Sequence, residues 1–209
     1  VGSSSVSRPY EPQAGRRAYL ASHIPGAHFL HLDEDLSGSV TGRNGRHPLP
    51  DASLLAARLA ALGVDESKQV VAYDGAGGMM AARLWWLLRW LGHKNVALLD
   101  GGWGKWLRED RAETATVPQP SRPSPLLRTD FTAAPRNDWI VDAAYVEHHL
   151  NHPQMRLIDA RSPERFQGIE KNFDQVAGHV PGAINRFFKA NLDASGCFKD
   201  AGALRAAFR

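Results

Sequence analysis

Ser22-His23-Ile24-Pro25-Gly26-Ala27 and Gly178-His179-Val180-Pro181-Gly182-Ala183 share one six-residue pattern, with His, Pro, Gly and Ala in the same places. A single copy would say little, because Pro-Gly is compatible with a type II turn almost anywhere. An internal repeat, in contrast, indicates how the whole chain is organised. Asp51 and Asp200 follow the two copies at similar offsets, and each precedes an apolar helical pattern as an N-cap would. The sequence therefore predicts two related domains in tandem.

The composition is that of a globular protein. Of its 209 residues, 43% are hydrophobic and 22% charged, the net charge is +3, and the basic residues are scattered. This pattern argues against a nucleic-acid partner and is compatible with a small anion. No apolar run approaches the roughly 18 residues that span a bilayer and no signal-peptide pattern opens the chain, so we expect no membrane partner. The single cysteine excludes an internal disulfide and fits a reducing compartment, which predicts a cytoplasmic protein.

Strand and helix patterns alternate through the first half of the chain. Buried-type strands are expected at 69–73 and 95–99, and helices at 51–62, 79–91 and 103–108. In the second half, the pattern predicts a helix capped by Asp142, a strand over 155–160, a short helix within 161–168 and a final helix after Asp200. Such alternation predicts an α/β fold in which a mostly parallel sheet is flanked by helices.

A proline-rich stretch separates the two halves. Its prolines are Pro118, Pro120, Pro123, Pro125 and Pro135. We therefore expect a first domain over residues 1–110, an extended linker rather than a packed element over 111–137, and the start of a second domain over 138–209.

The first predicted strand runs into Asp74-Gly75-Ala76-Gly77-Gly78, directly before a helix. Backbone N–H groups of such a loop, together with a helix N-terminus, form a cradle for an anion. Asp74 occupies the first position, where its own charge would fill the cradle, and a carboxylate cannot act as a thiolate-like nucleophile. We expect Asp74 to order the loop and the first domain to be catalytically silent; a tight turn without any other role is the alternative.

The spacing of the repeat also predicts what the chain lacks. When the distances from His23 and Asp51 to Asp74 are transferred to the second copy, its loop falls beyond Arg209. The first copy, in turn, has no obvious strand before Arg16. We therefore expect the chain to be a fragment at both ends, with the second domain incomplete.

Several motifs together resemble the tandem-domain rhodanese family, the thiosulfate and 3-mercaptopyruvate sulfurtransferases. Besides the two turns, these motifs are Val71-Ala72-Tyr73-Asp74, Ala82-Arg83-Leu84-Trp85-Trp86, Leu99-Asp100-Gly101-Gly102-Trp103, Asp159-Ala160-Arg161 and Glu164-Arg165-Phe166-Gln167-Gly168. The resemblance implies two rhodanese-like domains, the first inactive and commonly carrying Asp where Asp74 stands. It implies that the second domain's loop begins with a cysteine that accepts sulfane sulfur from thiosulfate or 3-mercaptopyruvate and passes it to cyanide or a thiol. It further implies an active site between the domains, and it implies neither a metal nor an organic cofactor.

The resemblance also suggests substrate-binding residues. Arg165 matches the family arginine that holds the donor's sulfonate or carboxylate through paired N–H groups; the alternative is a surface ion pair with Glu164 or Glu170. His23 is a second candidate, with a role in fixing the turn as the alternative. Relatives that prefer mercaptopyruvate often have another arginine seven residues before the repeat histidine, where this chain has Asn172, and this difference favours thiosulfate.

Cys197 precedes the final helix, no predicted strand leads into it, and it matches no family nucleophile. We therefore place the nucleophile beyond residue 209 and expect the 209 residues alone to be inactive. Two other functions stay open. One is a catalytically inactive rhodanese-fold protein with a binding or regulatory role, and the other is a phosphatase-like relative whose loop is one residue longer. His148 and His149 have no Cys or carboxylate at metal-ligand spacing, so a zinc site is not expected.

Overall fold

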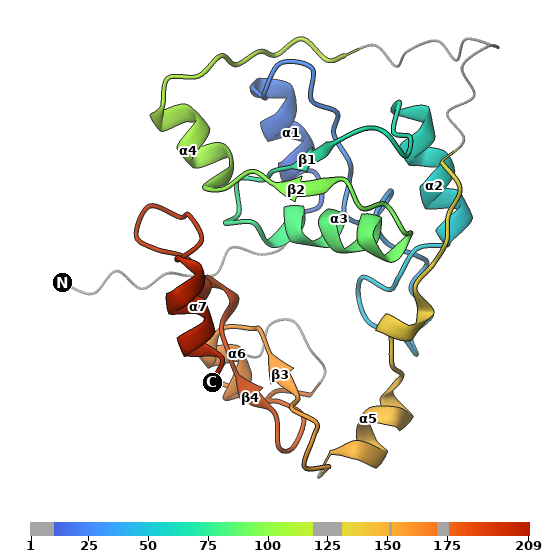
Figure 1. Ribbon diagram of the computed structural model, residues 1–209, viewed down its shortest axis with the longest axis vertical. Coiled ribbons are helices and arrows are strands. Elements are labelled where there is room, and N and C mark those ends of the chain that lie inside the picture. The colour runs from blue at the N-terminus through green and yellow to red at the C-terminus, as the bar shows by residue number, and fades with distance from the viewer. Residues whose placement is uncertain (1–10, 119–130, 151, 171–175) are drawn as a thin grey trace. The chain divides into compact units, whose positions relative to one another are not determined.

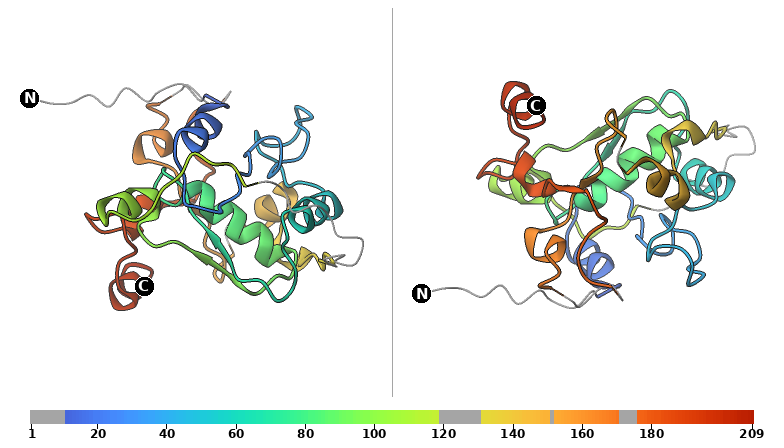
Figure 2. Two further views of the ribbon diagram at one scale, coloured as in Figure 1. Left: turned by 90° about the horizontal axis from the view of Figure 1, so that it is seen from above. Right: turned by 90° about the horizontal axis from the view of Figure 1, so that it is seen from below.

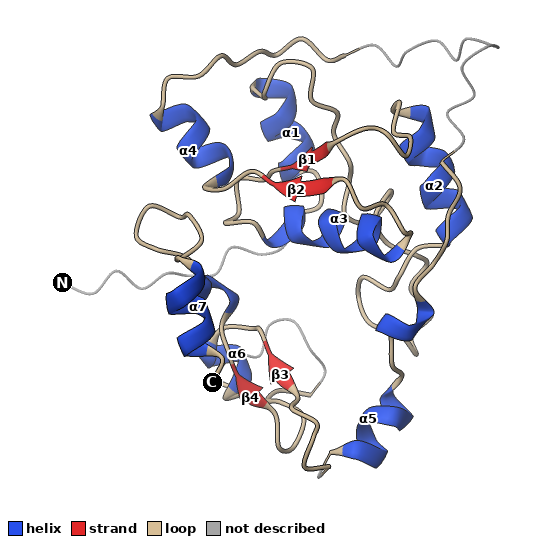
Figure 3. Cartoon of the chain, viewed as in Figure 1, coloured by secondary structure: helices blue, strands red, loops and turns tan. Residues whose placement is uncertain are grey.

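The computed structural model describes residues 11–118, 131–150, 152–170 and 176–209. The chain divides into two compact units, one of Val1–Val70 with Asp110–Ala134 and one of Val71–Glu109 with Pro135–Arg209. Strands are short and pair two at a time, whereas helices make up most of the regular structure (Figures 1 and 3).

The helices of the first unit are α1 (Ala14–Ala21) and α2 (Ala52–Ala61). α2 begins after Asp51, whose carboxylate accepts hydrogen bonds from two backbone N–H groups of the first turn. Leu55 and Leu59 lie on the inner face of α2 and are each 2% exposed. The predicted helix and its Asp51 cap are therefore confirmed.

An antiparallel bridge between His23 and Thr114 joins distant parts of the first unit. The His23 N–H donates to the Thr114 carbonyl at 2.8 Å, and the Thr114 N–H donates back at 2.9 Å. Phe131 is only 8% exposed. Two residues of the stretch predicted as a linker, 111–137, therefore have partners within this unit: Thr114 pairs with His23, and Phe131 is buried. Proline has no backbone N–H group and cannot donate to a bridge. Thr114 lies before Pro118, the first proline of the stretch, so its N–H group is available for pairing.

In the second unit, β1 (Val70–Ala72) pairs with β2 (Val96–Leu98), and α3 (Met79–Trp90) packs against β2 (Figures 1 and 2). α4 (Gly102–Arg108) follows β2 after a glycine turn. All four elements confirm the predicted patterns. Buried apolar side chains form the core here: Ala72, Ala81, Leu87, Leu88, Trp90 and Leu91. β1 is less buried than predicted, because Val71 is 53% exposed and only alternate side chains face the core.

The remainder of the second unit consists of short elements. They are the 3-10 helix η1 (Asn137–Trp139), α5 (Ala143–His149), β3 (Ile158–Asp159), α6 (Pro163–Phe166), β4 (Ile184–Asn185), the 3-10 helix η2 (Phe188–Asn191) and α7 (Ala201–Ala207). β3 and β4 are parallel, with Ile158 opposite Ile184 and Asp159 opposite Asn185. The sequence predicted α5, β3, α6 and α7. It did not predict η1, β4 and η2, which are too short to show a periodic pattern.

The two His-x-Pro-Gly turns have the same backbone geometry. Gly26 and Gly182 have φ values of +79° and +80°, a left-handed conformation that glycine adopts without strain. In each turn the alanine N–H donates to the carbonyl of the residue three positions earlier at 3.0 Å.

The histidines of the two turns also have matching contacts. His23 Nδ1 lies 2.7 Å from the Tyr19 carbonyl oxygen, and the two rings stack with centroids 3.9 Å apart. His179 Nδ1 lies 2.7 Å from the Phe166 carbonyl oxygen, and these rings stack at 3.6 Å. Each histidine thus stacks on an aromatic residue of the preceding helix. His179 is farther in sequence from Phe166 than His23 is from Tyr19.

Among the described residues, no helix combines the length and the apolar character needed to cross a membrane.

Candidate functional site

The loop between β1 and α3 closes around the carboxylate of Asp74. Oδ1 accepts hydrogen bonds from the N–H groups of Ala76 and Gly78, both at 2.8 Å. Oδ2 accepts from Met80 at 2.7 Å and from Ala81 at 2.8 Å. The carboxylate therefore lies at the N-terminus of α3, where the helix dipole and the converging N–H groups favour negative charge. It takes up the hydrogen bonds that a bound anion would need.

Glycines allow this loop to fold so tightly. Gly77 and Gly78 have φ values of +77° and +88°, which turn their neighbours' N–H groups towards Asp74. Gly102 is needed for a different reason, because a Cβ there would lie 2.7 Å from the Asp74 carbonyl oxygen. That oxygen accepts a hydrogen bond from the Trp103 N–H at 3.0 Å, which ties the start of α4 to the loop.

Cys197 lies in a tight turn whose ends, Leu192 and Phe198, form an antiparallel bridge. Its N–H donates to Asp193 Oδ1 at 3.1 Å, and the residue is only 9% exposed. A Cβ added to Gly101 would lie 3.1 Å from the sulfur, so the thiol packs against the α4 N-terminus. Within the described residues, no backbone N–H donates to this sulfur. The thiol is therefore a small buried group without an amide cradle around its sulfur.

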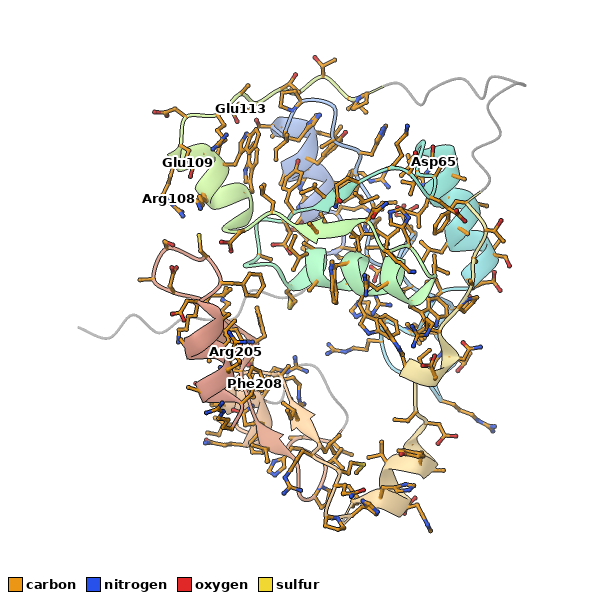
Figure 4. The ribbon with its side chains drawn as sticks, viewed as in Figure 1. Asp65, Arg108, Glu109, Glu113, Arg205 and Phe208 are labelled. Carbon is orange, nitrogen blue, oxygen red and sulfur yellow. The ribbon has the colours of Figure 1, made fainter. Side chains whose placement is uncertain are left out.

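Three contacts attach this turn to α4 and its neighbourhood. The Phe198 N–H donates to Asp100 Oδ1 at 2.8 Å. Arg108, at the end of α4 (Figure 4), donates to the Ser195 carbonyl oxygen at 2.6 Å. Leu192 and Phe198 also line a small pocket that reaches Asp74. The turn therefore borders the Asp74 loop from within the same unit.

The carboxyl end of β3 carries a charged pair, Asp159 and Arg161. Arg161 Nε lies 3.0 Å from both carboxylate oxygens, and a terminal amine lies 2.5 Å from Oδ2. The same amine also donates to the Gly178 carbonyl oxygen at 2.7 Å. The hydrogen bonds from Arg161 are the main reason why the pKa of Asp159 is below its usual value; burial acts against them, and the charge of Arg165 adds to the lowering. Asp159 is therefore held ionised and Arg161 is neutralised.

Arg165 belongs to α6, which begins four residues after β3. Ser162 caps this helix by accepting the Arg165 N–H at 3.4 Å. Its charge contributes to the lowered pKa of Asp159, the last residue of β3. Residues that follow the carboxyl ends of parallel strands are candidates for ligand binding in α/β sheets.

His23 is 1% exposed in the first unit, whereas Arg165 belongs to the second. Besides its contact with Tyr19, His23 has Nε2 3.2 Å from the Thr116 carbonyl oxygen. This enclosure favours the alternative in which His23 fixes the turn. Asn172 lies outside the described residues.

Sequence reasoning overlooked Arg186, which directly follows β4. Its N–H donates to the Asp159 carbonyl oxygen at 2.9 Å, and its side chain donates to Asn191 Oδ1 at 2.8 Å. The guanidinium also lies over the Phe208 ring, 4.9 Å from the centroid. The available signal was an arginine two residues after Ile184, the apolar residue that follows the second turn, where a strand end could be expected.

Within the described part of the chain, no group of three or more His, Cys, Asp or Glu side chains is arranged to hold a metal ion.

A parallel strand pair with charged side chains at its carboxyl end, and a glycine-rich loop of N–H groups at a helix N-terminus, define an α/β protein with an anion cradle. The family model for the rhodanese-like domain matches residues 8–109. The chain belongs to this family, because the crystal structure of SseA from Escherichia coli, described as a 3-mercaptopyruvate sulfotransferase, is 30% identical. That match covers 92% of this chain and 69% of SseA, with a TM-score of 0.75.

Two curated relatives extend the comparison. A protein named as a probable 3-mercaptopyruvate sulfurtransferase from Pseudomonas aeruginosa is 44% identical over 190 residues, covering 90% of this chain and 65% of that protein. The thiosulfate sulfurtransferase of Bos taurus is 32% identical over 210 residues, covering 95% of this chain and 66% of that protein. The chain therefore spans about two thirds of the length of these relatives.

Proposed function

We propose that this chain is part of a sulfurtransferase that moves sulfane sulfur from thiosulfate or 3-mercaptopyruvate to cyanide or a thiol. The observation that carries the proposal is the 44% identity to the Pseudomonas protein over 90% of this chain. The name of the Pseudomonas protein supports 3-mercaptopyruvate as a donor, and that of the bovine relative supports thiosulfate.

The proposed reaction passes through a cysteine persulfide. A thiolate attacks the outer sulfur of thiosulfate, and sulfite leaves with the electron pair of the broken S–S bond. The acceptor then attacks the sulfane sulfur, and the thiolate is released unchanged. These steps use no metal and no organic cofactor.

The nucleophilic cysteine is proposed to lie beyond residue 209, because no thiol described here stands in an amide cradle. The cradle after β1 is filled by the Asp74 carboxylate, and Cys197 is buried in a different kind of turn. Arg165 is proposed to hold the donor's sulfonate or carboxylate, for which a guanidinium offers two parallel N–H groups.

The proposed organisation is a non-catalytic domain over 1–110, a linker over 111–137 and the start of the catalytic domain over 138–209. The matching contacts of His23 and His179 with aromatic rings support a duplication, since both turns use the same local construction. A reducing compartment such as the cytoplasm is proposed, because the chain has one cysteine only.

The test measures thiocyanate formation from thiosulfate and cyanide by the 209-residue chain and by its Cys197→Ser variant. We expect no turnover from either protein. An extended protein that also contains the residues encoded after Arg209 is expected to form thiocyanate in the same assay. It is expected not to hydrolyse an aryl phosphate.

Turnover by the 209-residue chain that disappears in the Cys197→Ser variant would identify Cys197 as the nucleophile and overturn its proposed position. An extended protein that forms no thiocyanate would favour a binding or regulatory role. Hydrolysis of the aryl phosphate would favour the phosphatase-like alternative.

A further inference from the structure

Arg186 stands where a ligand of the β3–β4 pair would bind. It is the first residue after β4, and its backbone N–H is bonded to Asp159 of the neighbouring parallel strand at 2.9 Å. Beyond the carboxyl ends of parallel strands, the backbones diverge and leave room for a ligand. Arg165 lies on α6, the helix that follows β3, so each strand of the pair is followed in the chain by an arginine.

The guanidinium of Arg186 is held in place by neutral groups. One terminal amine donates to the Asn191 side-chain oxygen at 2.8 Å, and the flat face covers Phe208 at 4.9 Å. Its Nε is buried, and no group in the described part of the chain accepts a hydrogen bond from it. Arg161 differs, since the Asp159 carboxylate neutralises it at 2.5–3.0 Å.

A partly buried arginine held only by neutral groups is costly unless an anion offsets its charge. Arginine is suited to this task, because its planar guanidinium offers pairs of N–H groups that match two oxygens of a carboxylate or a sulfonate. The side chain is already ordered by Asn191 and Phe208, so little rotamer entropy remains to be lost when an anion binds.

We propose that Arg186 is a second binding residue for the anionic sulfur donor, contacting an oxygen of its sulfonate or carboxylate through its guanidinium. The inference rests on the proposed function, because it concerns the donor site to which Arg165 was assigned. With an arginine after each strand of the pair, the site would favour donors that carry a full negative charge on oxygen.

The test measures the binding of thiosulfate and of pyruvate to the 209-residue chain by calorimetry. Thiosulfate represents the sulfonate-like donor, and pyruvate carries the carboxylate of mercaptopyruvate. Arg186→Gln should weaken the binding of the preferred anion at least about tenfold, because a charge-assisted hydrogen bond is lost. Arg186→Lys keeps the charge but lacks the fork, so an intermediate loss is expected.

Arg205→Gln is the matched control. Arg205 is exposed on α7, next to Phe208 (Figure 4), and its loss removes the same charge from the same neighbourhood. This variant should bind within about twofold of the original chain, since an exposed charge is screened by salt. Circular dichroism of each variant separates lost binding from lost structure; if Arg186→Gln unfolds, the Arg186→Lys result decides.

The outcomes separate the inference from the proposed function. If Arg165→Gln abolishes binding while the Arg186 variants bind normally, the second-residue inference is overturned and the donor site stands. If Arg186→Gln and Arg205→Gln weaken binding equally, the effect is one of net charge and the inference is also overturned. If the original chain binds neither anion, both the inference and the arginine-based donor site are overturned, whereas thiocyanate formation by the extended protein still tests the reaction itself.

Discussion

At the scale of single residues, the Asp74 loop shows how one side chain can determine what a cradle does. Four N–H groups converge on its carboxylate at 2.7–2.8 Å. The same N–H groups would stabilise any anion at this position, a thiolate included. The loop therefore has the electrostatics of an activating site but carries a side chain that cannot act as a sulfur nucleophile.

Asp74→Cys should accordingly create a thiol that is ionised at neutral pH. We expect its pKa to fall well below the value of about 8.5 of a free cysteine, because the cradle and the α3 dipole stabilise the thiolate. The measurement is the rate of alkylation by iodoacetamide as a function of pH, read for each cysteine by peptide mass spectrometry. The rate should be half-maximal well below pH 8.5.

Asp65→Cys is the control for this substitution. Asp65 also accepts a backbone N–H, that of Ser67 at 2.9 Å, but it stands in a surface turn rather than at a helix N-terminus (Figure 4). Because hydrogen bonds from Ser67 and the charge of Lys68 lower the pKa of Asp65 itself, the pKa of its replacement should also fall below the free value. The fall should be smaller than that of the Asp74→Cys thiol. Cys197 serves as an internal reference in both proteins and should react slowly, since it is 9% exposed. Equal pH profiles for the two new thiols would contradict the interpretation of the cradle.

Residues of the site differed in how far the sequence predicted them. Asp74 could be placed because a strand pattern, glycines and a helix pattern define its loop without reference to distant residues. Arg186 could not, because its importance comes from Asn191, Phe208 and the parallel pairing with β3, none of which leaves a local pattern. The enclosure of His23 was also hidden, since Thr114 and Thr116 approach it from the far end of the unit.

At the scale of elements, α2 and α7 have the same kind of N-cap but differ in how many side chains they bury. Asp51 Oδ1 accepts the N–H groups of the two residues that follow Ala52, at 2.9 Å each. Asp200 Oδ1 makes the corresponding bonds at 2.8 and 2.9 Å. The caps are alike, but α2 supplies buried side chains and α7 supplies none. The same local interaction should therefore affect global stability differently.

Asp51→Ala should lower the free energy of unfolding by about 1 kcal/mol, the usual effect of removing an N-cap side chain. Asp200→Ala should leave the free energy of global unfolding nearly unchanged and increase fraying of α7, because little of the core depends on that helix. Urea denaturation measures the first effect, and hydrogen exchange of the α7 amides measures the second.

A Ser53→Ala variant controls for the change of side chain in the first turn of α2, since its cap stays intact. If Asp51→Ala and Asp200→Ala reduce the free energy of unfolding equally, α7 contributes to the global fold as much as α2 does, and the burial argument is wrong.

Both helices could be predicted from the sequence because caps and apolar periodicity are local signals. β4 and η2 could not, because elements of two to four residues depend on their pairing partners.

At the scale of the whole molecule, burial is distributed unevenly along the chain. α2 contributes side chains 2% exposed, and α3 contributes Leu87 and Leu88, which are inaccessible to solvent. In the described part of 135–209, Cys197 is the single buried residue. Apolar side chains of β3 and β4, such as Ile158 and Ile184, are instead about half exposed. The α/β class could be predicted because helix and strand patterns still alternate in the sequence of 135–209. The weak burial of this segment could not be predicted, because such a pattern shows which face of an element is apolar but not what covers that face.

This distribution predicts a gradient of local stability. Opening a segment that buries few apolar groups costs little free energy, so its amides exchange through local fluctuations rather than global unfolding. In native-state hydrogen exchange of the 209-residue chain, the amides of α3 should be the slowest, and those of α5 and α7 should exchange at least about a hundredfold faster. Protection of α5 or α7 equal to that of α3 would contradict the argument from burial. Repeating the measurement at two protein concentrations assigns the cause of such protection, because a surface covered by self-association gains protection with concentration and an intrinsically stable segment does not.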